Sequence, residues 1–336
     1  MRVGWLGAGH IATFHSKMLR AERIDGVAWA GVFDPDRSRA ERFATASGAT
    51  VAESEEQVLD GCDAVFICTW TSEHRRLVEM AAERRVAVFC EKPLATTAAE
   101  ARAMAEAVDA AGVTNQVGLI MRRYPAFAVL ADLVHDPAAG RLMSVVFRDD
   151  QWLPVPGEYG STWRGDAEKA GAGVLLEHSI HDLDIIEAAI SPITAVCARS
   201  AAFHRLPGIE DLMVVMLELE GGAVGTLTTV WHDVAPRPSL RRVEVFCERR
   251  WIALESDLNG PVVWTDADGS SRSLDPDGVV ARAAEVGVSG WPQRAFVEAA
   301  AAGAPVTPSF RDALRAHEVT DAVYRSAADR GAWVSV

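Results

Sequence analysis

The feature that most constrains this chain is the stretch at residues 2–12, RVGWLGAGHIA. A short apolar run leads directly into Gly7-x-Gly9-x-x-Ala12, and an acidic residue, Asp34, ends the next apolar run 34 − 12 = 22 positions later. This spacing predicts a strand, a tight turn and a helix that hold the pyrophosphate of a dinucleotide. The start of the helix supplies N–H donors. We expect the dinucleotide to bind at Gly7, Gly9, His10, Ile11 and Asp34.

The acid at position 34 also bears on which dinucleotide binds. A carboxylate there accepts hydrogen bonds from ribose hydroxyls and repels a 2′-phosphate, which favours NAD. Arg37 and Arg39 follow closely and would bind a 2′-phosphate if Asp34 turned away, so NADP stays the alternative. Asp34-Pro35-Asp36 also fits a turn and a helix cap, a role that is compatible with ribose binding.

Size and charge exclude several classes of protein. With 336 residues, 49% of them apolar, the chain is long enough for two domains. Its net charge of −14 disfavours nucleic acid and anionic membranes as partners and favours a small polar molecule. The five cysteines form no Cys-x-x-Cys pair, which argues against both a zinc cluster and a disulfide framework. Without a leader or a long apolar run, the protein is expected to be cytoplasmic.

Strands and helices alternate through the N-terminal third. Strand patterns at 64–68 and 86–90 and helix patterns at 73–84 and 98–111 predict a parallel, doubly wound sheet. Ligands of such sheets bind beyond the carboxyl ends of the strands, so the loops at 69–74 and 91–94 should face the cofactor. Lys92 either exchanges a proton with a substrate hydroxyl or is a surface Lys paired with Glu91. His74 either binds ribose or carboxamide or is merely solvated. The candidate cofactor contacts here are Thr69, Trp70, His74, Glu91 and Lys92.

Taken together, Gly7-x-Gly9-x-x-Ala12, Asp34, Thr69-x-x-x-x-His74 and Glu91-Lys92-Pro93-Leu94-Ala95 resemble the glucose-fructose oxidoreductase and inositol 2-dehydrogenase family. The resemblance implies a Rossmann domain, which we expect at 1–121, and an α+β domain with a large, mainly antiparallel open sheet, expected at 122–336. It also implies that Lys92 lies at the nicotinamide, with a peptide bond to Pro93 that is often cis. The family's common Thr-Pro reads Thr69-Trp70 here, so Trp70 is expected to shape or cover the nicotinamide pocket.

A second concentration of polar residues follows Gly171-Ala-Gly173. Glu177 and His181 stand four apart and so share a helix face, where the carboxylate can orient an imidazole that acts as general acid or base. His178 and Asp182 are expected to brace the helix or pair with loops. A metal site would need Glu177, His178, His181 and Asp184, and one helix cannot aim these four groups at one point, so no metal site is expected. A hydrogen-bonded structural His181 is the alternative.

The resemblance makes the prediction for this helix more specific, because the family has a Gly-rich turn, then Asp, then His four residues later. Glu177 replaces that Asp and is one methylene longer, so it contacts substrate or only orients His181. The expected catalytic residues are therefore Lys92, His181 and Glu177.

Further polar residues are candidates for binding substrate. An Arg followed by an aromatic stands at the family's domain crossover, and here two arginines, Arg122 and Arg123, precede Tyr124. Trp163-Arg164 resembles the family's Trp-Arg before the Gly-rich turn. The alternatives are solvent contacts for the arginines at the crossover, an Arg164–Asp166 pair and a Trp163 packed under the sheet. The candidate substrate contacts are Arg122, Arg123, Trp163, Arg164 and His178.

Alternating stretches fill the C-terminal half, at 143–152, 194–203, 212–219, 223–231, 242–247 and 251–255. Hairpin connectors at 220–222 and 248–250 predict an antiparallel sheet. One face of such a sheet can stay free, and its apolar residues would suit a homodimer or homotetramer. The patterns at 293–302 and 310–329 predict helices.

These patterns indicate an NAD(P)-dependent oxidoreductase that passes a hydride between nicotinamide and a sugar, an inositol-like polyol or a related carbinol. A non-catalytic NAD(P)-binding sensor is a second hypothesis, favoured if no polyol changes the NAD(P)H absorbance. A redox-assisted glycosidase that uses NAD transiently is a third, and it would release sugar without net NADH.

Overall fold

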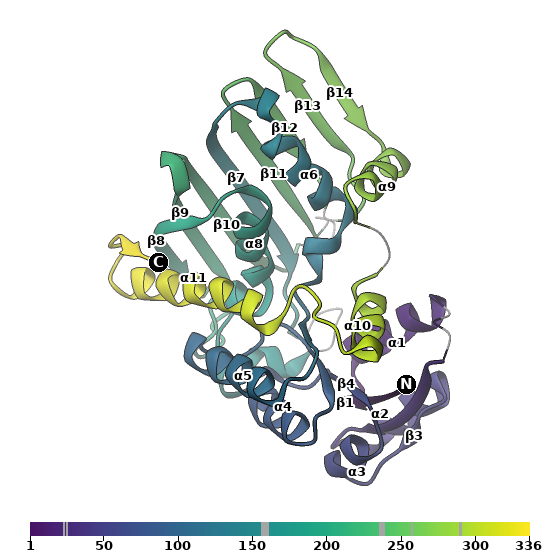
Figure 1. Cartoon of the computed structure of the whole chain (residues 1–336). Coiled ribbons are helices and arrows are strands. Elements are labelled where there is room, and N and C mark those ends of the chain that lie inside the picture. Colours follow the sequence, from purple (N-terminus) through teal and green to yellow (C-terminus); the bar gives the residue numbers. More distant parts are fainter. Residues whose placement is uncertain (23, 25, 156–160, 235–238, 257, 289–290) are drawn as a thin grey trace. The chain divides into compact units, whose positions relative to one another are not determined.

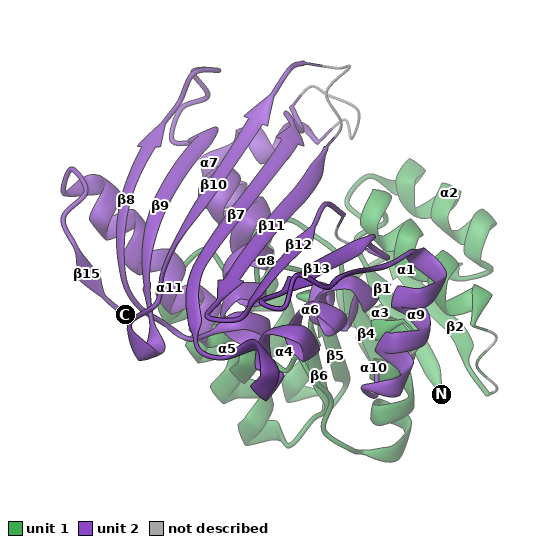
Figure 2. Ribbon diagram, turned by 90° about the horizontal axis from the view of Figure 1, so that it is seen from above, with its two compact units in different colours: residues 1–119, 290–314 green, residues 120–289, 315–336 purple. Residues whose placement is uncertain are grey.

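A computed structural model describes the chain except residues 23, 25, 156–160, 235–238, 257 and 289–290. The chain forms two compact units (Figure 2), which we call unit 1, residues 1–119 and 290–314, and unit 2, residues 120–289 and 315–336. Within the described ranges, no helix has the length and apolar character needed to cross a membrane.

Unit 1 is built on a six-stranded parallel sheet, with strand order β3-β2-β1-β4-β5-β6. This confirms the predicted doubly wound sheet, whose strand order is that of a dinucleotide-binding fold. Its strands are β1 (Arg2–Leu6), β2 (Ala28–Phe33), β3 (Thr50–Val51), β4 (Ala64–Ile67), β5 (Ala87–Cys90) and β6 (Asn115–Val117). Its helices are α1 (His10–Ala21), α2 (Arg37–Ser47), α3 (Glu55–Asp60), α4 (His74–Glu83), α5 (Ala98–Ala111) and α10 (Pro292–Ala302), with the 3-10 turn η1 (Thr71–Glu73).

An aromatic core crosses the middle of this sheet. Every residue of β4 and β5 is buried, as expected of parallel strands covered on both faces. Trp5 stacks on Phe66 with ring centroids 4.6 Å apart, and Phe66 stacks on Phe89 at 4.7 Å. Phe296 of α10 meets Phe66 edge-on at 5.3 Å. The central strands are thereby held rigidly, and the loops at their carboxyl ends start from fixed points.

Residues 290–314 belong to unit 1, although the expected division ran without interruption from 122 to 336. The aromatic core explains their place, because Phe296 fills it. The chain after α10 also lies along β6, where the Val117 N–H donates to the Pro308 carbonyl at 2.9 Å. Asn115 Oδ1 accepts from the Phe310 N–H at 2.8 Å, at the start of α11 (Phe310–Ala328).

Unit 2 is built on a nine-stranded sheet, with strand order β14-β13-β12-β11-β7-β10-β9-β8-β15. All neighbours are antiparallel except β7 and β10, so the predicted, mainly antiparallel sheet is confirmed. The strands are β7 (Leu142–Trp152), β8 (Ile193–Ala201), β9 (Leu212–Leu219), β10 (Val224–His232), β11 (Leu240–Cys247), β12 (Arg250–Leu254), β13 (Val262–Asp266), β14 (Ser271–Leu274) and β15 (Val334–Ser335).

The helices of unit 2 cover one face of this sheet (Figures 1 and 2). They are α6 (Pro125–His135), α7 (Ala167–Ala170), α8 (Ile180–Ile185), α9 (Pro276–Glu285) and the larger part of α11, with π-type turns η5 (Leu175–Ser179) and η6 (Ile186–Ile190) on either side of α8. Short 3-10 turns are η2 (Ile120–Arg123), η3 (Pro137–Ala139), η4 (Thr162–Gly165) and η7 (Glu220–Gly222). Strand residues alternate between buried and exposed, as in β9, so one face forms the core and the other stays uncovered.

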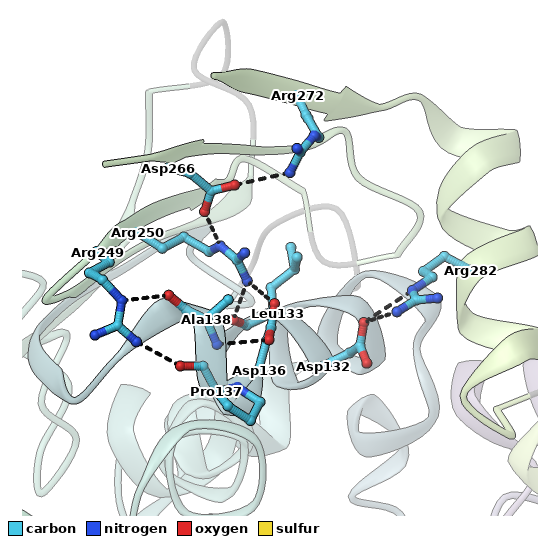
Figure 3. A network of polar contacts seen from close by, with 10 residues as sticks. All are labelled: Asp132, Leu133, Asp136, Pro137, Ala138, Arg249, Arg250, Asp266, Arg272 and Arg282. Atoms are coloured by element: carbon cyan, nitrogen blue, oxygen red, sulfur yellow. Dashed lines mark hydrogen bonds and ion pairs between the residues drawn. The ribbon is translucent and has the colours of Figure 1, made fainter. Parts of the chain in front are cut away.

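A polar network attaches the last strands to α6 and η3 (Figure 3). The buried Arg250 on β12 donates to Asp266 of β13 at 2.6 Å, to the Leu133 carbonyl at 3.1 Å and to Asp136 at 2.8 Å. Asp132 of α6 accepts two bonds from Arg282 of α9, at 3.0 and 2.7 Å. Arg250 therefore joins three elements through one guanidinium.

Replacing Arg250 by Met should lower the free energy of unfolding by about 3 kcal/mol, because it leaves the Asp266 carboxylate and a helix-end carbonyl without this donor. Urea denaturation followed by circular dichroism measures the loss. The matched control is Arg249→Ala, whose exposed guanidinium donates to the Ala138 and Pro137 carbonyls. This control substitution should lower the free energy of unfolding by less than about 1 kcal/mol. Equal losses for the two variants would contradict the bracing role of Arg250.

Candidate active site

The loop after β1 has the geometry that phosphate binding needs. Gly7 has φ +90°, and a Cβ there would lie 2.5 Å from the Cys68 carbonyl oxygen, so no other residue fits. Gly9 is the N-cap of α1, and a Cβ on it would meet nothing within 4 Å. His10 and Ile11 form the first turn. The residues present therefore fit a pyrophosphate that lies against backbone at the start of α1.

Asp34, at the end of β2, is bonded to this loop. Its Oδ2 accepts from the Ala8 N–H at 2.8 Å and its Oδ1 accepts from the Asp36 N–H at 2.8 Å, while Asp36 caps α2. The remaining lone pairs of Asp34 suit ribose hydroxyls. Arg37 pairs with Glu41 and Glu53, and Arg39 pairs with Asp36. Both arginines that were candidates for a 2′-phosphate thus have acidic partners, which fits NAD better than NADP.

Two strands of unit 1, β4 and β5, deliver the other cofactor candidates to the same edge of the sheet as the Gly-rich loop, because β1, β4 and β5 are adjacent and parallel. Thr69 and Trp70 follow β4, and Trp70 is 37% exposed. His74 is buried at the start of α4 rather than solvated, and its Nδ1 lies 3.0 and 3.2 Å from the Pro93 and Leu94 carbonyls. Burial lowers the pKa of His74, so it is a neutral donor that braces the loop after Lys92.

Glu91 and Lys92 follow β5. The Lys92–Pro93 peptide bond is cis, as the resemblance implied. Glu91 is buried rather than at the surface: its Oε1 lies 2.5 Å from His15 Nε2, and its Oε2 accepts from the Lys92 N–H at 3.1 Å. Gln293 contacts the other His15 nitrogen at 2.7 Å. Burial alone would raise the pKa of Glu91, but the hydrogen bond and charge of His15 outweigh it, so the pKa falls.

In unit 2, the segment that carries Glu177, His178 and His181 is anchored at its start by Glu210. This carboxylate accepts from the Gly173 and Leu175 N–H groups at 2.8 and 3.0 Å and from the Tyr324 hydroxyl at 2.9 Å. A Cβ on Gly173 would lie 1.9 Å from the Glu210 carbonyl oxygen, which explains the glycine of the turn. Burial raises the pKa of Glu210, although four hydrogen bonds oppose it.

Glu177 lies in the π-type turn η5 and pairs with Arg164. The Arg164 Nε donates to Glu177 Oε1 at 2.7 Å, while the Glu177 side chain is nearly fully buried. The expected alternative, an Arg164–Asp166 pair, is wrong, because Asp166 caps α7 and pairs with Lys169. Trp163 is partly buried against the core, and the Arg164 guanidinium lies 4.8 Å from its ring centroid. Glu177, Trp163 and Arg164 therefore form one contiguous group.

His178, His181 and Asp182 follow in η5 and α8, and the structure buries His181 to 6% exposure. His178 Nε2 lies 3.1 Å from Asp149 Oδ2 on β7 and 2.9 Å from Arg241 Nη2 on β11. Arg241 Nε donates to Asp182 at 2.6 Å. His178 and Asp182 thus brace the helix against strands, not loops.

Arg122 and Arg123 lie in η2. Arg122 binds Asp184 of α8 through Nε at 2.8 Å and Nη2 at 2.6 Å, a two-pronged ion pair on a buried carboxylate. This ion pair attaches Arg122 to α8. Burial lowers the pKa of the partly buried Arg123.

The sequence reasoning missed several residues that support these segments, namely His15 in unit 1 and Asp149, Glu210, Arg241 and Tyr324 in unit 2. A signal existed for two of them. Asp149 follows Val145 and Phe147 at inward positions of β7, and Arg241 precedes Val243 and Val245 in the same way on β11. A charged residue in the buried set of an alternating strand requires a buried partner. Among the described residues, no three His, Cys, Asp or Glu side chains are grouped as a metal site.

Comparison with known proteins agrees with this architecture. Residues 1–119 match the model of the oxidoreductase family with an NAD-binding Rossmann fold, and residues 127–253 match the GFO/IDH/MocA C-terminal domain. The chain is 30% identical to scyllo-inositol 2-dehydrogenase (NAD(+)) of Bacillus subtilis (strain 168), over 82% of this chain and 80% of that protein. It is 26% identical to inositol 2-dehydrogenase of Rhizobium meliloti (strain 1021), over 98% of both chains.

A solved structure of levoglucosan dehydrogenase in complex with NADH has the same fold. It superposes with a TM-score of 0.86 and 22% identity, covering 100% of this chain and 99% of that one. The matched domains, the relatives and the fold agree, and the chain belongs to the GFO/IDH/MocA oxidoreductase family.

Proposed function

We propose that this chain is an NAD-dependent dehydrogenase whose substrate is the CH–OH group of a sugar, an inositol-like polyol or a related carbinol. The observation that carries the proposal lies within unit 1, where the Gly7–Asp34 site and Lys92 stand at the same edge of one parallel sheet. The named activities of the inositol dehydrogenase relatives support the substrate class. Bound NAD would supply the nicotinamide ring that exchanges a hydride with the substrate carbon.

The protein's own residues hold the cofactor and move a proton. In this proposal Gly7, Gly9, His10 and Ile11 bind the pyrophosphate, and Asp34 binds the ribose. Thr69, Trp70 and His74 shape the nicotinamide end, and His74 and Glu91 hold the Lys92 backbone through the contacts described above. Lys92 and His181 exchange the proton of the substrate hydroxyl. Glu177, paired with Arg164, provides a fixed negative charge in the segment that carries His181.

The substrate contacts are proposed at Arg123, Trp163, Arg164 and His178. Arg122 is better placed to position α8 through Asp184 than to bind substrate. A sensor without activity and a redox-assisted glycosidase are less well supported, because both proton-transfer candidates are present and the named relatives are dehydrogenases. A panel of cyclic polyols and pyranoses with NAD, followed by NADH absorbance, tests the class.

All five cysteines are free thiols, and four of them are buried. Free buried thiols accord with a reducing compartment, so we propose a cytoplasmic location. Fractionation of cells that produce the protein tests this point.

Replacing Lys92 by Met should lower kcat by about 10²- to 10⁴-fold, because a positioned proton-transfer group is lost. The affinity for NAD, measured by calorimetry, should stay close to that of the wild type, since Lys92 adds no pyrophosphate contact in this proposal. Lys17→Met, at an exposed position of α1, is the matched control. Wild-type turnover by the Lys92 variant would remove this residue from the mechanism.

Asp34→Asn should shift the cofactor preference toward NADP. The amide keeps an acceptor but loses the charge that repels a 2′-phosphate, so the ratio of kcat/KM for NAD to that for NADP should fall about tenfold or more. Steady-state kinetics with both cofactors measure the ratio. Asp60→Asn, the same change at an exposed position at the end of α3, should leave it unaltered. An unchanged ratio in the Asp34 variant would speak against ribose recognition by this carboxylate.

The uncovered face of the unit 2 sheet is proposed to bind a second copy of the chain. Exposed apolar side chains are aligned there across β9, β10, β7 and β11, and they are Val146, Val214, Met216, Val224 and Phe246. They alternate with buried residues along each strand, so they share one face of the sheet, and an isologous interface uses the same face of both copies.

Val146→Glu should convert a wild-type dimer or tetramer into monomer, because it places a charge in the middle of this apolar face. Sedimentation velocity at micromolar concentration measures the mass. Val280→Glu on α9, away from the sheet, is the control. A wild-type chain that sediments as a monomer would refute the proposal.

A further inference from the structure

A buried series of polar contacts in unit 1 leads from helix α1 to the backbone of Lys92. His15, in the second turn of α1, is fully buried, and its Nε2 lies 2.5 Å from Glu91 Oε1. The other carboxylate oxygen of Glu91 accepts from the Lys92 N–H at 3.1 Å. On the far side of the ring, Gln293 of α10 contacts His15 Nδ1 at 2.7 Å. Three segments that are remote in sequence thus meet at one imidazole.

Packing alone does not account for a histidine at this position. Its ring lies in the aromatic core of the sheet, with its centroid 4.9 Å from that of Phe89 and 5.8 Å from that of Phe66. An apolar side chain would fill this place without the cost of removing two ring nitrogens from water. The contact with Glu91 gives the histidine a purpose that an apolar residue could not serve.

The direction of each hydrogen bond in the series follows from the groups involved. The Lys92 N–H can only donate, and it donates to Glu91. Burial alone would raise the pKa of Glu91, but His15 and Lys92 lower it, so this side chain is a carboxylate that only accepts. His15 Nε2 must therefore carry a hydrogen and donate it to Glu91. The carboxylate is held from one side by the imidazole and itself holds the Lys92 backbone.

Gly118, directly after β6, leaves room for this carboxylate. A Cβ on Gly118 would lie 2.9 Å from the Lys92 backbone nitrogen and 3.0 Å from each carboxylate oxygen of Glu91. Its φ lies outside the left-handed region, so lack of space, and not backbone strain, requires a glycine here. Glu91 and the Lys92 nitrogen thus fit closely between His15 and Gly118.

These contacts fix the backbone on both sides of the Lys92 side chain. Glu91 holds the N–H of Lys92, and His74 Nδ1 lies 3.0 Å from the carbonyl of the next residue, Pro93. A lysine side chain is long and flexible, so its ammonium group is aimed accurately only if its Cα is fixed. Helix α1 begins at His10, where the pyrophosphate is proposed to bind. His15 therefore connects the helix of the cofactor site to the backbone of the proton-transfer residue.

We propose that His15 is a positioning residue for Lys92, because through Glu91 it fixes the Lys92 backbone against the helix whose first turn binds the pyrophosphate. The proposal deepens the function proposed above and rests on it for the role of Lys92. His15 acts through Glu91 and contacts neither substrate nor cofactor.

The kinetic test uses the full-length protein with NAD and its best polyol. His15→Leu removes the donor to Glu91 and should lower kcat by about 10²-fold, as expected when a reacting group is displaced, while the affinity for NAD measured by calorimetry stays within about twofold. His15→Gln restores an N–H donor at a similar reach, so its kcat should be at least about tenfold higher than that of His15→Leu. His135→Leu, at an exposed position of α6, is the control. Equal kcat values for the two Leu variants would overturn the proposal.

A second variant leaves every polar side chain in place. Gly118→Ala adds one methyl group against the Lys92 nitrogen and the Glu91 carboxylate, so it should lower kcat by about tenfold without weakening NAD binding. Gly61→Ala, at the end of α3, is the control, because a Cβ there comes no closer than 3.1 Å to any listed neighbour and lies away from this loop. Wild-type kcat in the Gly118 variant would contradict the proposed positioning.

Hydrogen exchange tests the same contact without any substrate. The chain contains three lysines, Lys17, Lys92 and Lys169, so labelling with ¹⁵N-lysine gives one backbone amide signal for each. In His15→Leu the Lys92 amide should exchange with deuterium at least about tenfold faster than in the wild type, while Lys17, on the same helix as residue 15, keeps its rate. An unchanged rate at Lys92, or equal acceleration at Lys17, would overturn the proposal. If the wild type oxidises no polyol, the proposed function fails, and the exchange rates still decide whether His15 holds this backbone.

Discussion

The burial of charge beneath α8 is the constraint on which the second unit depends. The carboxylate of Asp149, at the centre of a nine-stranded sheet, is stable only if donors surround it. Arg241 on the neighbouring β11 and Ser179 of the helical segment contact it, and Thr229 on β10 contacts Ser179. The helical segment supplies the remaining hydrogen-bond partners. The helix is therefore attached at Asp182 and His178 by directional contacts, where apolar packing alone would let it slide or rotate. Asp184, bound to Arg122, and Gly173, bound to Glu210, fix its two ends.

The first unit uses carboxylates in a similar way, with backbone as the partner. Asp34 joins the Gly-rich loop to the end of β2, and Glu91 joins the Lys92 backbone to His15 on α1. In both places one oxygen holds a neighbouring N–H and so fixes a loop at the ligand edge of the sheet. Because the strands beneath are packed around Trp5, Phe66 and Phe89, each of these carboxylates holds its loop against a rigid sheet. Loops with such anchors need little reorganisation when a ligand binds.

Local sequence patterns were enough for much of this architecture. The Gly-rich turn, the strand alternation and the position of Lys92 depend on residues close together in the chain, where glycine geometry and hydrophobic period leave few options. The assignment of residues 290–314 to unit 1 could not be predicted from such local patterns. The pattern of α10 marks Phe296 as inward, but not which core it enters, and that core is formed by β4 and β5 some 200 residues earlier. The same holds for Glu210 and Arg241, whose partners are remote in sequence.

The missed residues nevertheless share a signature that physical reasoning can use. Val145, Phe147 and Asp149 form one face of β7, and Arg241, Val243 and Val245 form one face of β11. An acid in one apolar strand face and a base in another would each be strongly destabilising alone, so together they predict that the two strands are neighbours, with the charges at one level. The observed pairing of Arg241 with Asp149 meets that expectation. Charged residues in apolar strand faces thus carry information on register that hydrophobic alternation lacks, because alternation is satisfied equally by every shift of two residues.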